Sequence, residues 1–557
     1  MELIIVLAIS IGITILNSSH VIIQWIANKP GSTFTAIAHS YADYFLYVGA
    51  IAQGAAGRWI WAEHLFTNES MGATWYYWFY VALGHIGSWV GLSPFGTYNV
   101  SLIILVFLLC LTWYFLTKTL YPTNRFLRWM SWLMIFTMTN FYWDGKLLGQ
   151  FWFSPALLFS RLGGVPYHVT QSILFIVLAI VLTRILTIKS AFRIMKYEVR
   201  IMGKPFASSF IIHNSLFIIP LAFFAANANP VQMLLFGASA VLTAGIVAQG
   251  SWIRRGGVIS LIFVAGGIGA ISTNVEFSRQ AVFTAARIWE LAQQVPHSLP
   301  ILLLSVGPVV FFIPFGLQKI WKAKNPLPTL LIIWGLLSFI LFLSPIPRLM
   351  GLSPVRFLHP VPYAAALAIL GAEGLMALSG LLARRLKNIV TLTTIRVALI
   401  ALYLLLTIPA IARQFTERIT PAQNPQLLMD TIYNHVPAPI TEALTWIRVT
   451  VLNPVSQSVV LVDPAIPIEV LVPVFTGLPS FSGHPIHTLY PDVKEVKRQE
   501  FFGGKMSPKD AEQFLKDNRI GYIITTPARR LPLKLRKAYD NTTVTIYKST
   551  NGKSTNE

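Results

Sequence analysis

The feature that most constrains this chain is a series of long apolar runs separated by short polar loops. A run of about 17–23 apolar residues can cross the hydrocarbon core of a bilayer as a helix. Eleven runs near this length occur, at 3–20, 99–117, 128–142, 168–188, 206–225, 229–249, 257–273, 299–317, 328–344, 359–382 and 395–412. The sequence therefore predicts a polytopic α-helical membrane protein with about eleven transmembrane helices.

Composition agrees with this class. Only 12% of the 557 residues are charged, against about 25% in soluble proteins, and the mean hydropathy is +0.61. These values exclude an ordinary cytosolic enzyme and a disordered or fibrous chain. The single cysteine, Cys110, excludes a disulfide framework and a cysteine-based zinc site.

The distribution of charge predicts the orientation of the chain. The net charge is +21, but the basic residues lie in short loops between apolar runs, so no nucleic-acid partner is expected. With the N-terminus inside and the aromatic run 73–92 lying in the interface, the inner loops hold 17 Lys and Arg and the outer loops hold 8. Counting 73–92 as a span destroys this asymmetry. The positive-inside rule therefore predicts an external segment 21–98, a cytoplasmic loop 190–204 and an external C-terminus. The first run is expected to stay as an uncleaved anchor.

A change of composition near residue 413 predicts two domains, a transmembrane domain over 1–412 and an extracytoplasmic domain over 413–557. The second is expected to be a small α/β domain. We predict helices at 438–450 and from Ser507 to Asn518, and strands at 459–463, 468–475, 520–525 and 543–548.

Asp43 is the first candidate catalytic residue. It lies in the external segment, in Ala38-His-Ser-Tyr-Ala-Asp-Tyr-Phe-Leu-Tyr47, at the start of an amphipathic stretch. A carboxylate near the membrane surface can act as a general base on a hydroxyl or amine acceptor. The alternative is an acid that caps a helix or occupies its first turn, where the helix dipole favours it.

The next external loop supplies a second group of candidates. Asp144 lies in Tyr142-Trp-Asp-Gly-Lys146. It is either part of an Asp-Gly turn or a second acid near the same outer cavity as Asp43. The same loop carries Arg161 and His168. Arginines are rare in outer loops, so Arg161 needs an acidic partner or a phosphate to explain it.

A late external segment adds Arg356 and His359, which lie where the tenth run begins. Arg356 is either a phosphate ligand or an interfacial arginine whose head group reaches into water. Glu373 falls within the tenth run, where an acid is costly, and no partner can be named for it. His484 and His487 form a His-x-x-His motif without a nearby acid in the sequence, which is a weak metal signal.

The order of these motifs resembles that of the GT-C superfamily of polytopic glycosyltransferases. The resemblance is carried by Asp43-Tyr-x-x-Tyr47, by Gln53-Gly-x-x-Gly-x-Trp59 and by the turn Thr67-Asn-Glu69. It covers the whole chain in architecture, and in motifs residues 36–70, 142–168 and 345–375. It is similar in particular to bacterial members of the protein O-mannosyltransferase and aminoarabinose transferase type that have an external α/β tail.

The resemblance implies a transfer of a hexose or pentose from a polyprenyl-phosphate-linked donor to a saccharide, lipid or protein acceptor. This would occur among the lipids of the bacterial cytoplasmic membrane, on its outer face. In the family the acid of the first external loop is catalytic or binds metal, which implies this role for Asp43; many members carry a second acid beside it, where this chain has Tyr44. Asp144 is the matching acid of the second loop. Arg356 matches the late phosphate-binding arginine, with Arg161, His168 and His359 as candidate helpers. Some members use a divalent metal ion such as Mg²⁺ or Mn²⁺, and others use none.

Two other functions remain open from the residues. A lipid or saccharide transporter or flippase predicts polar residues spread through the spans. An O-antigen polymerase-like or ligase-like enzyme predicts its chemistry in large late external loops, whereas the long external segment here is the first one.

Overall fold

The computed structural model describes residues 1–28, 30–37, 39–150, 154–187, 206–247, 252–293, 298–323, 325–386, 390–423, 431–451 and 458–549. The predicted cytoplasmic loop 190–204 lies outside these residues. Contacts divide the chain into two compact units. The first contains Met1–Asn17, Ile104–Asn274 and Leu291–Arg418, and the second contains Ser18–Ile103, Val275–Glu290 and Ile419–Glu557.

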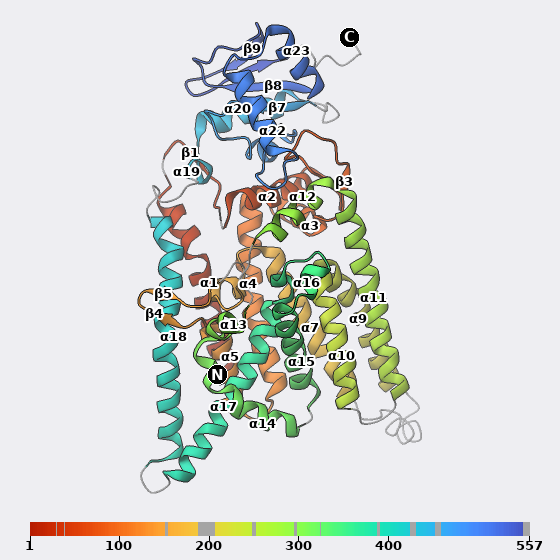
Figure 1. Ribbon diagram of the computed structural model, residues 1–557, viewed down its shortest axis with the longest axis vertical. Coiled ribbons are helices and arrows are strands. Elements are labelled where there is room, and N and C mark those ends of the chain that lie inside the picture. The colour runs from red at the N-terminus through yellow and green to blue at the C-terminus, as the bar shows by residue number, and fades with distance from the viewer. Residues whose placement is uncertain are drawn as a thin grey trace. The chain divides into compact units, whose positions relative to one another are not determined.

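The first unit is built almost entirely from helices (Figure 1). Together with helices that continue into the second unit, they are α1 (Glu2–Ile26), α4 (Pro94–Leu120), α5 (Arg125–Thr137), α6 (Leu158–Leu162), α7 (Pro166–Thr187), α9 (Phe206–Ala228), α10 (Pro230–Ile246), α11 (Trp252–Arg279), α13 (Leu299–Val306), η1 (Gly307–Phe311), α14 (Ile313–Ala323), α15 (Pro326–Leu343), α16 (Ile346–Leu349), η2 (Pro354–Phe357), α17 (Pro360–Arg385) and α18 (Leu392–Gln423). A short hairpin of β4 (Tyr142–Trp143) and β5 (Lys146–Leu147) interrupts them.

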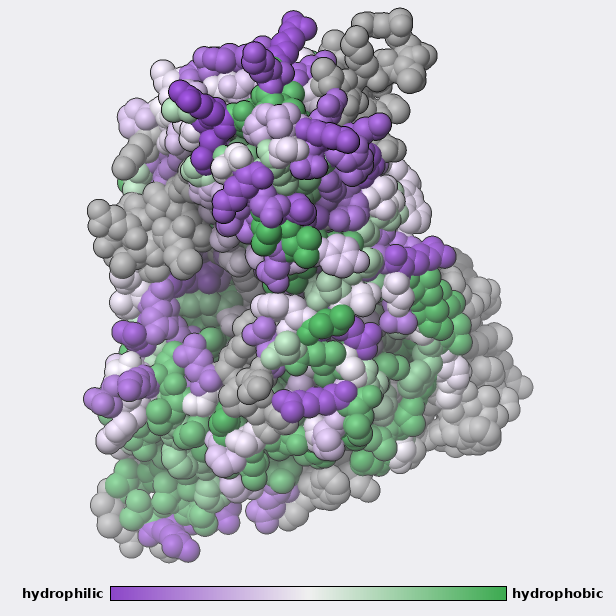
Figure 2. All heavy atoms as spheres, turned by 45° about the horizontal axis from the view of Figure 1, so that its top comes forward, coloured by the Kyte–Doolittle hydropathy of each residue, from purple (hydrophilic) through white to green (hydrophobic). Residues whose placement is uncertain are grey.

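Within the described residues, seven helices are long and apolar enough to cross a membrane: α1, α4, α7, α11, α15, α17 and α18. An eighth candidate is a pair of helical segments, Leu299–Phe311 and Ile313–Ile320, that meet at 73°. A multi-pass membrane fold is therefore confirmed. Broad hydrophobic areas visible on the surface in Figure 2 agree with exposed apolar side chains along these helices, such as Ile11, Val264 and Leu405.

Three of the eleven predicted runs, 128–142, 229–249 and 299–317, do not form a single long, straight helix in the described residues. The run 128–142 corresponds to α5, which has 13 residues and ends at Thr137; at 1.5 Å per residue it is about 20 Å long, too short to cross alone. The run 206–225 lies in α9, a helix of 23 residues, and the run 229–249 forms α10, which has 17 residues. The run 299–317 is bent by 73° at Phe312, between Leu299–Phe311 and Ile313–Ile320.

The second unit combines most of the segment 21–98, which the sequence predicts to be external, with the C-terminal region. Its elements are β1 (Ser32–Phe34), α2 (Tyr41–Ala55), β2 (Ala62–Glu63), β3 (Ala73–Thr74), α3 (Trp78–Trp89), α12 (Ala281–Ala292), α19 (Thr431–Asn434), β6 (His435–Pro437), α20 (Ala438–Thr450), β7 (Val459–Val462), α21 (Val472–Thr476), α22 (Pro491–Phe502), α23 (Pro508–Asp517), β8 (Ile520–Thr525), β9 (Arg536–Asp540) and β10 (Thr545–Lys548). The aromatic run 73–92 forms the 12-residue α3, so it is too short to be a span.

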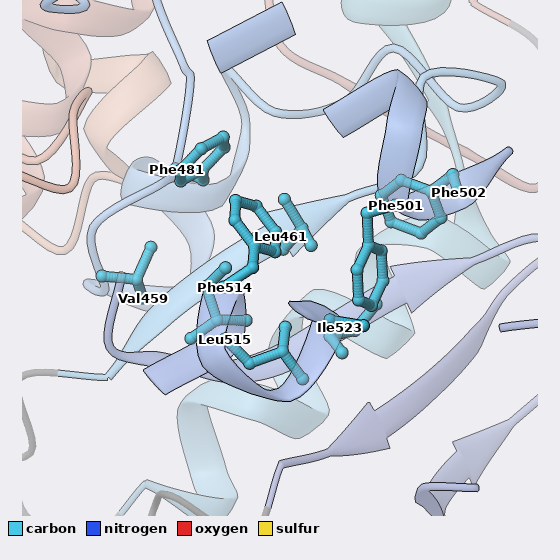
Figure 3. Packing of buried hydrophobic residues seen from close by; sticks show 10 residues of the cluster. Val459, Leu461, Phe481, Phe501, Phe502, Phe514, Leu515 and Ile523 are labelled. Carbon is cyan, nitrogen blue, oxygen red and sulfur yellow. The ribbon is translucent and has the colours of Figure 1, made fainter. Parts of the chain in front are cut away.

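The C-terminal region folds around a four-stranded sheet of order β7-β8-β10-β9. β7 and β8 are parallel, and the other two pairs are antiparallel. Figure 3 shows the core of the region, in which Phe481, Phe501 and Phe514 pack together beside the aliphatic side chains of the strands. The predicted α/β class is confirmed.

Most local predictions for this region are confirmed, including helix 438–450, the strands at 459–463, 520–525 and 543–548, and the helix after Ser507. The strand predicted at 468–475 is wrong, because the chain there is irregular and then forms α21. Two prolines, Pro467 and Pro473, lack the N–H that a paired strand needs. α22 and β9 were not predicted.

Several contacts join the segment 21–98 to the C-terminal region within the second unit. β1 pairs with β6 in an antiparallel ladder, and Thr67 forms an isolated bridge with Ser482. The Thr67-Asn-Glu69 turn also receives the ammonium group of Lys494, whose Nζ lies 2.7 Å from Glu69 Oε2 and 2.8 Å from Thr67 Oγ1. The segment 21–98 is therefore part of the same fold as the C-terminal region.

Candidate functional site

Asp43 lies in the first turn of α2. Ser40 occupies the N-cap position without a side-chain hydrogen bond, and Asp43 follows three residues later. The N-cap alternative for Asp43 is therefore wrong, whereas the first-turn alternative agrees with the structure, since the helix dipole favours an acid there. The Asp43 side chain is 42% exposed although nine residues of the helix are buried.

Two glycines, Gly54 on α2 and Gly84 on α3, allow these two helices to pack closely. A Cβ atom on Gly54 would come within 2.2 Å of the Val81 carbonyl oxygen, and one on Gly84 would meet a backbone oxygen of α2 at the same distance. The two helices can therefore approach this closely only with glycine at the contact. Gln53 ties the end of α2 to β2, because its amide donates to the Glu63 carbonyl at 2.9 Å and accepts from the Glu63 N–H at 2.7 Å.

Buried tyrosines surround the start of α2. Tyr44 donates to the Thr35 carbonyl, and Tyr47 stacks on Tyr80 with ring centroids 4.5 Å apart. Burial, with a smaller contribution from the negative charge of Asp43, raises the pKa of Tyr77 well above its usual value. Tyr77 therefore stays neutral at pH 7.

The partner that sequence reasoning missed is His484. Its Nε2 atom lies 3.4 Å from Asp43 Oδ1, and its side chain is completely buried. The His-x-x-His motif thus does have an acid near it in space, although none lies near it in the sequence. The only sequence signal was the motif itself.

Two further histidines lie beside this pair. The ring centroids of His484 and His487 are 4.7 Å apart, and those of His487 and His64 are 5.5 Å apart. Burial lowers the pKa of His64 to about 4 and that of His487 well below its usual value, so both are neutral at pH 7. Within the described ranges no three His, Cys, Asp or Glu side chains are arranged to hold a metal ion. The residues around Asp43 therefore do not fit a metal site, and no step below uses one.

Arg161 lies in the first unit and has a structural role. Only 3% of the residue is exposed, and its guanidinium donates to four backbone carbonyls at 2.6–3.0 Å. These belong to Ile135, Met138, Pro155 and Ala156. A lipid phosphate could use these N–H groups only after the carbonyls had lost them.

Arg356, in contrast, carries an exposed side chain on a firmly held backbone. It lies in η2, and the buried Gln232 amide donates to the carbonyls of Arg356 and Phe357, both at 3.0 Å. Trp334 in turn donates to the Gln232 side chain at 3.1 Å. The structure therefore presents the Arg356 side chain from a rigid turn.

The two candidate histidines of this unit differ in exposure. His359 is 5% exposed and is the N-cap of α17, where its Nδ1 accepts the Val361 N–H at 3.3 Å. His168, half-buried near the start of α7, interacts electrostatically with His359. His359 thus stabilises the start of α17.

Asp144 lies at the exposed tip of the β4–β5 hairpin. Asp144 and Gly145 have φ angles of +45° and +75°, as a tight Asp-Gly hairpin turn requires. The turn alternative for Asp144 agrees with the structure, and its catalytic role stays a prediction. For Glu373 the missing partner is Lys319 on α14, whose Nζ lies 2.7 Å from Glu373 Oε2.

Comparison of structures finds similar proteins, although comparison of sequences finds none. No family model matches the chain, and no curated protein matches it. The archaeal oligosaccharyltransferase AglB from Archaeoglobus fulgidus superposes with a TM-score of 0.51 at 13% identity, covering 94% of this chain and 69% of that chain. The arabinofuranosyltransferase AftD from Mycobacteria gives 0.48 at 11% identity, covering 99% and 42%. ArnT from Cupriavidus metallidurans gives 0.43 at 12%, covering 98% and 97%. The chain has the GT-C fold.

Proposed function

We propose that this protein is an integral membrane glycosyltransferase that transfers a sugar from a polyprenyl-phosphate-linked donor to an acceptor on the outer face of the cell membrane. The carrying observation is the fold shared with the archaeal oligosaccharyltransferase, combined with an accessible carboxylate, Asp43, in the first external segment. That relative was solved with dolichol-phosphate and an inhibitory peptide. A lipid-linked phosphate and an acceptor of saccharide, lipid or protein nature are the corresponding partners proposed here.

Asp43 is proposed as the general base. The acceptor hydroxyl or amine forms a bond to the anomeric carbon of the sugar as the bond from that carbon to the phosphate oxygen breaks. The polyprenyl phosphate leaves with the electron pair, and the acceptor proton passes to the Asp43 carboxylate. A positioned base typically contributes 10²–10⁴-fold to the rate.

Arg356 is proposed to hold the donor phosphate. A guanidinium binds phosphate oxygens through two parallel hydrogen bonds, and it stabilises the negative charge that develops on the leaving group. The exposed side chain on a backbone held by Gln232 supports this role. His168 stays a candidate helper, and Asp144 a candidate second acid. Arg161 is not included, because its guanidinium already donates to backbone carbonyls, and His359 is not included, because it is buried and its Nδ1 accepts a backbone N–H.

The orientation of the protein belongs to the same proposal. Residues 21–98 and 413–557 lie on the extracytoplasmic side, and the transmembrane domain 1–412 carries the reaction centre. The pairing of β1 with β6 supports this, since it requires the two external regions to be on one side of the membrane.

The test is the substitution Asp43→Asn in detergent-purified, folded protein, assayed with a panel of polyprenyl-phosphate-linked hexoses and pentoses. The amide is nearly isosteric but cannot accept the proton, so turnover should fall 10²–10⁴-fold. Glu63→Gln is the matched control, because it removes another partly exposed acid from the same segment. Glu63→Gln should change turnover by no more than about threefold. This is far less than the 10²–10⁴-fold fall expected when a general base is removed.

Two outcomes would overturn the proposal. Turnover of Asp43→Asn within about threefold of the parent would remove Asp43 as the base. Absence of sugar transfer from every donor, together with lipid flipping in proteoliposomes by the parent protein, would favour the transporter alternative instead.

A further inference from the structure

The contact between Asp43 and His484 joins the first external segment to the loop that precedes α22 in the C-terminal region. Both residues belong to the second compact unit. His484 Nε2 lies 3.4 Å from Asp43 Oδ1, and the His484 side chain is completely buried while Asp43 is partly exposed. A buried histidine therefore lies behind an accessible carboxylate.

Hydrogen bonds of the loop decide which His484 nitrogen carries the proton. The backbone N–H groups of Ile486 and His487 both donate to His484 Nδ1 at 3.0 Å. Since an imidazole nitrogen that accepts hydrogen bonds has no proton, Nδ1 holds the lone pair and the proton lies on Nε2. The Nε2–H is thus the group nearest the Asp43 carboxylate.

The position of the His484 ring is set by the surrounding loop. The Thr488 hydroxyl accepts the N–H groups of Gly483 and His484 at 3.1 and 3.0 Å, and it donates to the Phe66 carbonyl at 2.9 Å. The loop is thereby attached to the first external segment only a few residues after β2. On the other side the ring meets that of His487, which is neutral. The ring therefore has little freedom to turn away from Asp43.

We propose that His484 is a positioning residue for Asp43, whose carboxylate it orients toward the acceptor by donating its Nε2–H to Oδ1. This inference rests on the proposed function, in which Asp43 is the base. The distance of 3.4 Å exceeds that of a well-formed N–H···O bond, and catalytic contacts of this kind often tighten only when substrate is bound. The C-terminal region then contributes directly to the reaction centre, and its loss would impair catalysis as well as stability.

Two substitutions at the same position separate positioning from a structural role. In His484→Asn the side-chain oxygen lies near the place of Nδ1, so it can still accept the loop N–H groups, but the side chain is too short to reach Asp43. In His484→Gln the amide N–H can reach Asp43, whereas the loop loses its acceptor. Positioning predicts that His484→Asn keeps its melting temperature but loses about 10–100-fold in kcat, with the KM for the donor little changed. It predicts that His484→Gln melts at a lower temperature but retains the higher kcat of the two. A purely structural role predicts the opposite order, and that result would overturn the inference.

A double-mutant cycle separates failure of this inference from failure of the proposed function. If Asp43→Asn loses turnover and His484→Asn does not, Asp43 remains the base and only the positioning role is refuted. If both lose turnover, the effect of His484→Asn should disappear in the Asp43→Asn background, because the two residues act through one contact. Additive losses would contradict the inference.

A second measurement does not depend on the substrate. In ¹⁵N-histidine-labelled protein, His484 should show the tautomer with the proton on Nε2, and its Nε2 resonance should shift in Asp43→Asn but not in Glu63→Gln. The tautomer with the proton on Nδ1 would refute the proposed hydrogen bond.

Discussion

The structure predicts that Arg161 is needed for stability and not for donor binding. The change to make is Arg161→Met, which keeps the length of the side chain but removes all its N–H donors. Four carbonyls then lose their hydrogen bonds in a buried site. Each carbonyl left without a hydrogen bond costs about 1 kcal/mol, so the free energy of unfolding should fall by about 4 kcal/mol. Removal of the buried charge offsets part of this loss.

The assay is thermal unfolding of the detergent-purified protein, with Arg356→Met as the matched control. Arg356 is exposed, so its substitution should leave the melting temperature nearly unchanged while lowering the use of the polyprenyl-phosphate donor. Arg161→Met should lower the melting temperature by about 5 °C or more, and the fraction that stays folded should turn over normally. Arg348→Met, a second exposed arginine near the same turn, controls for loss of surface charge. An Arg161→Met protein that melts like the parent but has lost donor use would refute the structural assignment and restore Arg161 as a phosphate ligand.

Three further outcomes are expected. Burial lowers the pKa of His64 from 6.5 to about 4, so between these pH values the unfolded chain binds a proton that the folded chain does not. The free energy of unfolding should therefore fall by about 3 kcal/mol as the pH drops from 6.5 to 4, and His64→Phe should flatten this dependence in thermal melts. Asp463 is fully buried and accepts two hydrogen bonds of 2.7 Å from Arg529, so Arg529→Met should cost about 3 kcal/mol in urea unfolding of the full chain, and Asp463→Asn in the same protein should recover part of it. Single cysteines at Ser70 and Lys534, in a background without the native cysteine, should both react with an impermeant thiol reagent from outside the cell; labelling of only one would contradict the common side of the two external regions.

Local signals predicted the C-terminal region well because each is decided within a dozen residues. The helix after Ser507 is an example, since the Ser507 hydroxyl accepts the Asp510 N–H at 3.2 Å and donates to its carboxylate at 2.6 Å. The helix at 438–450 and the buried strands 459–463 and 520–525 are equally local patterns. The strand expected at 468–475 failed because its apolar residues are interrupted by prolines.

The contacts of the candidate site could not be predicted in the same way. Asp43 and His484, like Glu69 and Lys494, are brought together only when the first external segment folds onto the C-terminal region. The sequence identified Asp43 and His484 separately but gave no sign that they are partners, and it identified Glu69 without Lys494. Arg161 shows a second limit, because a guanidinium suits a phosphate and a set of carbonyls equally, and only tertiary structure decides between them.

The pairing of β1 with β6 limits how often the chain crosses the membrane. Since the two strands are adjacent, the chain must cross an even number of times between Phe34 and His435. Over that range the structure offers six of the seven long spans and the apolar helices α9 and α10, and the bent pair makes a ninth crossing if it is one broken span rather than a re-entrant loop. With the bent pair as a span, one more crossing is required, and of the runs predicted from the sequence only 128–142 remains.

α5 covers only part of that run, so we infer that the crossing is completed by non-helical backbone. Such backbone is tolerated at membrane depth only where it is buried in protein and its polar groups are hydrogen-bonded. Met138 and Thr139, which follow the helix, are buried. Arg161 donates to the carbonyls of Ile135 and Met138, and thus satisfies groups that a continued helix would have paired. A buried arginine at this point replaces helical hydrogen bonds, which is why its loss should be seen first in stability and not in donor use.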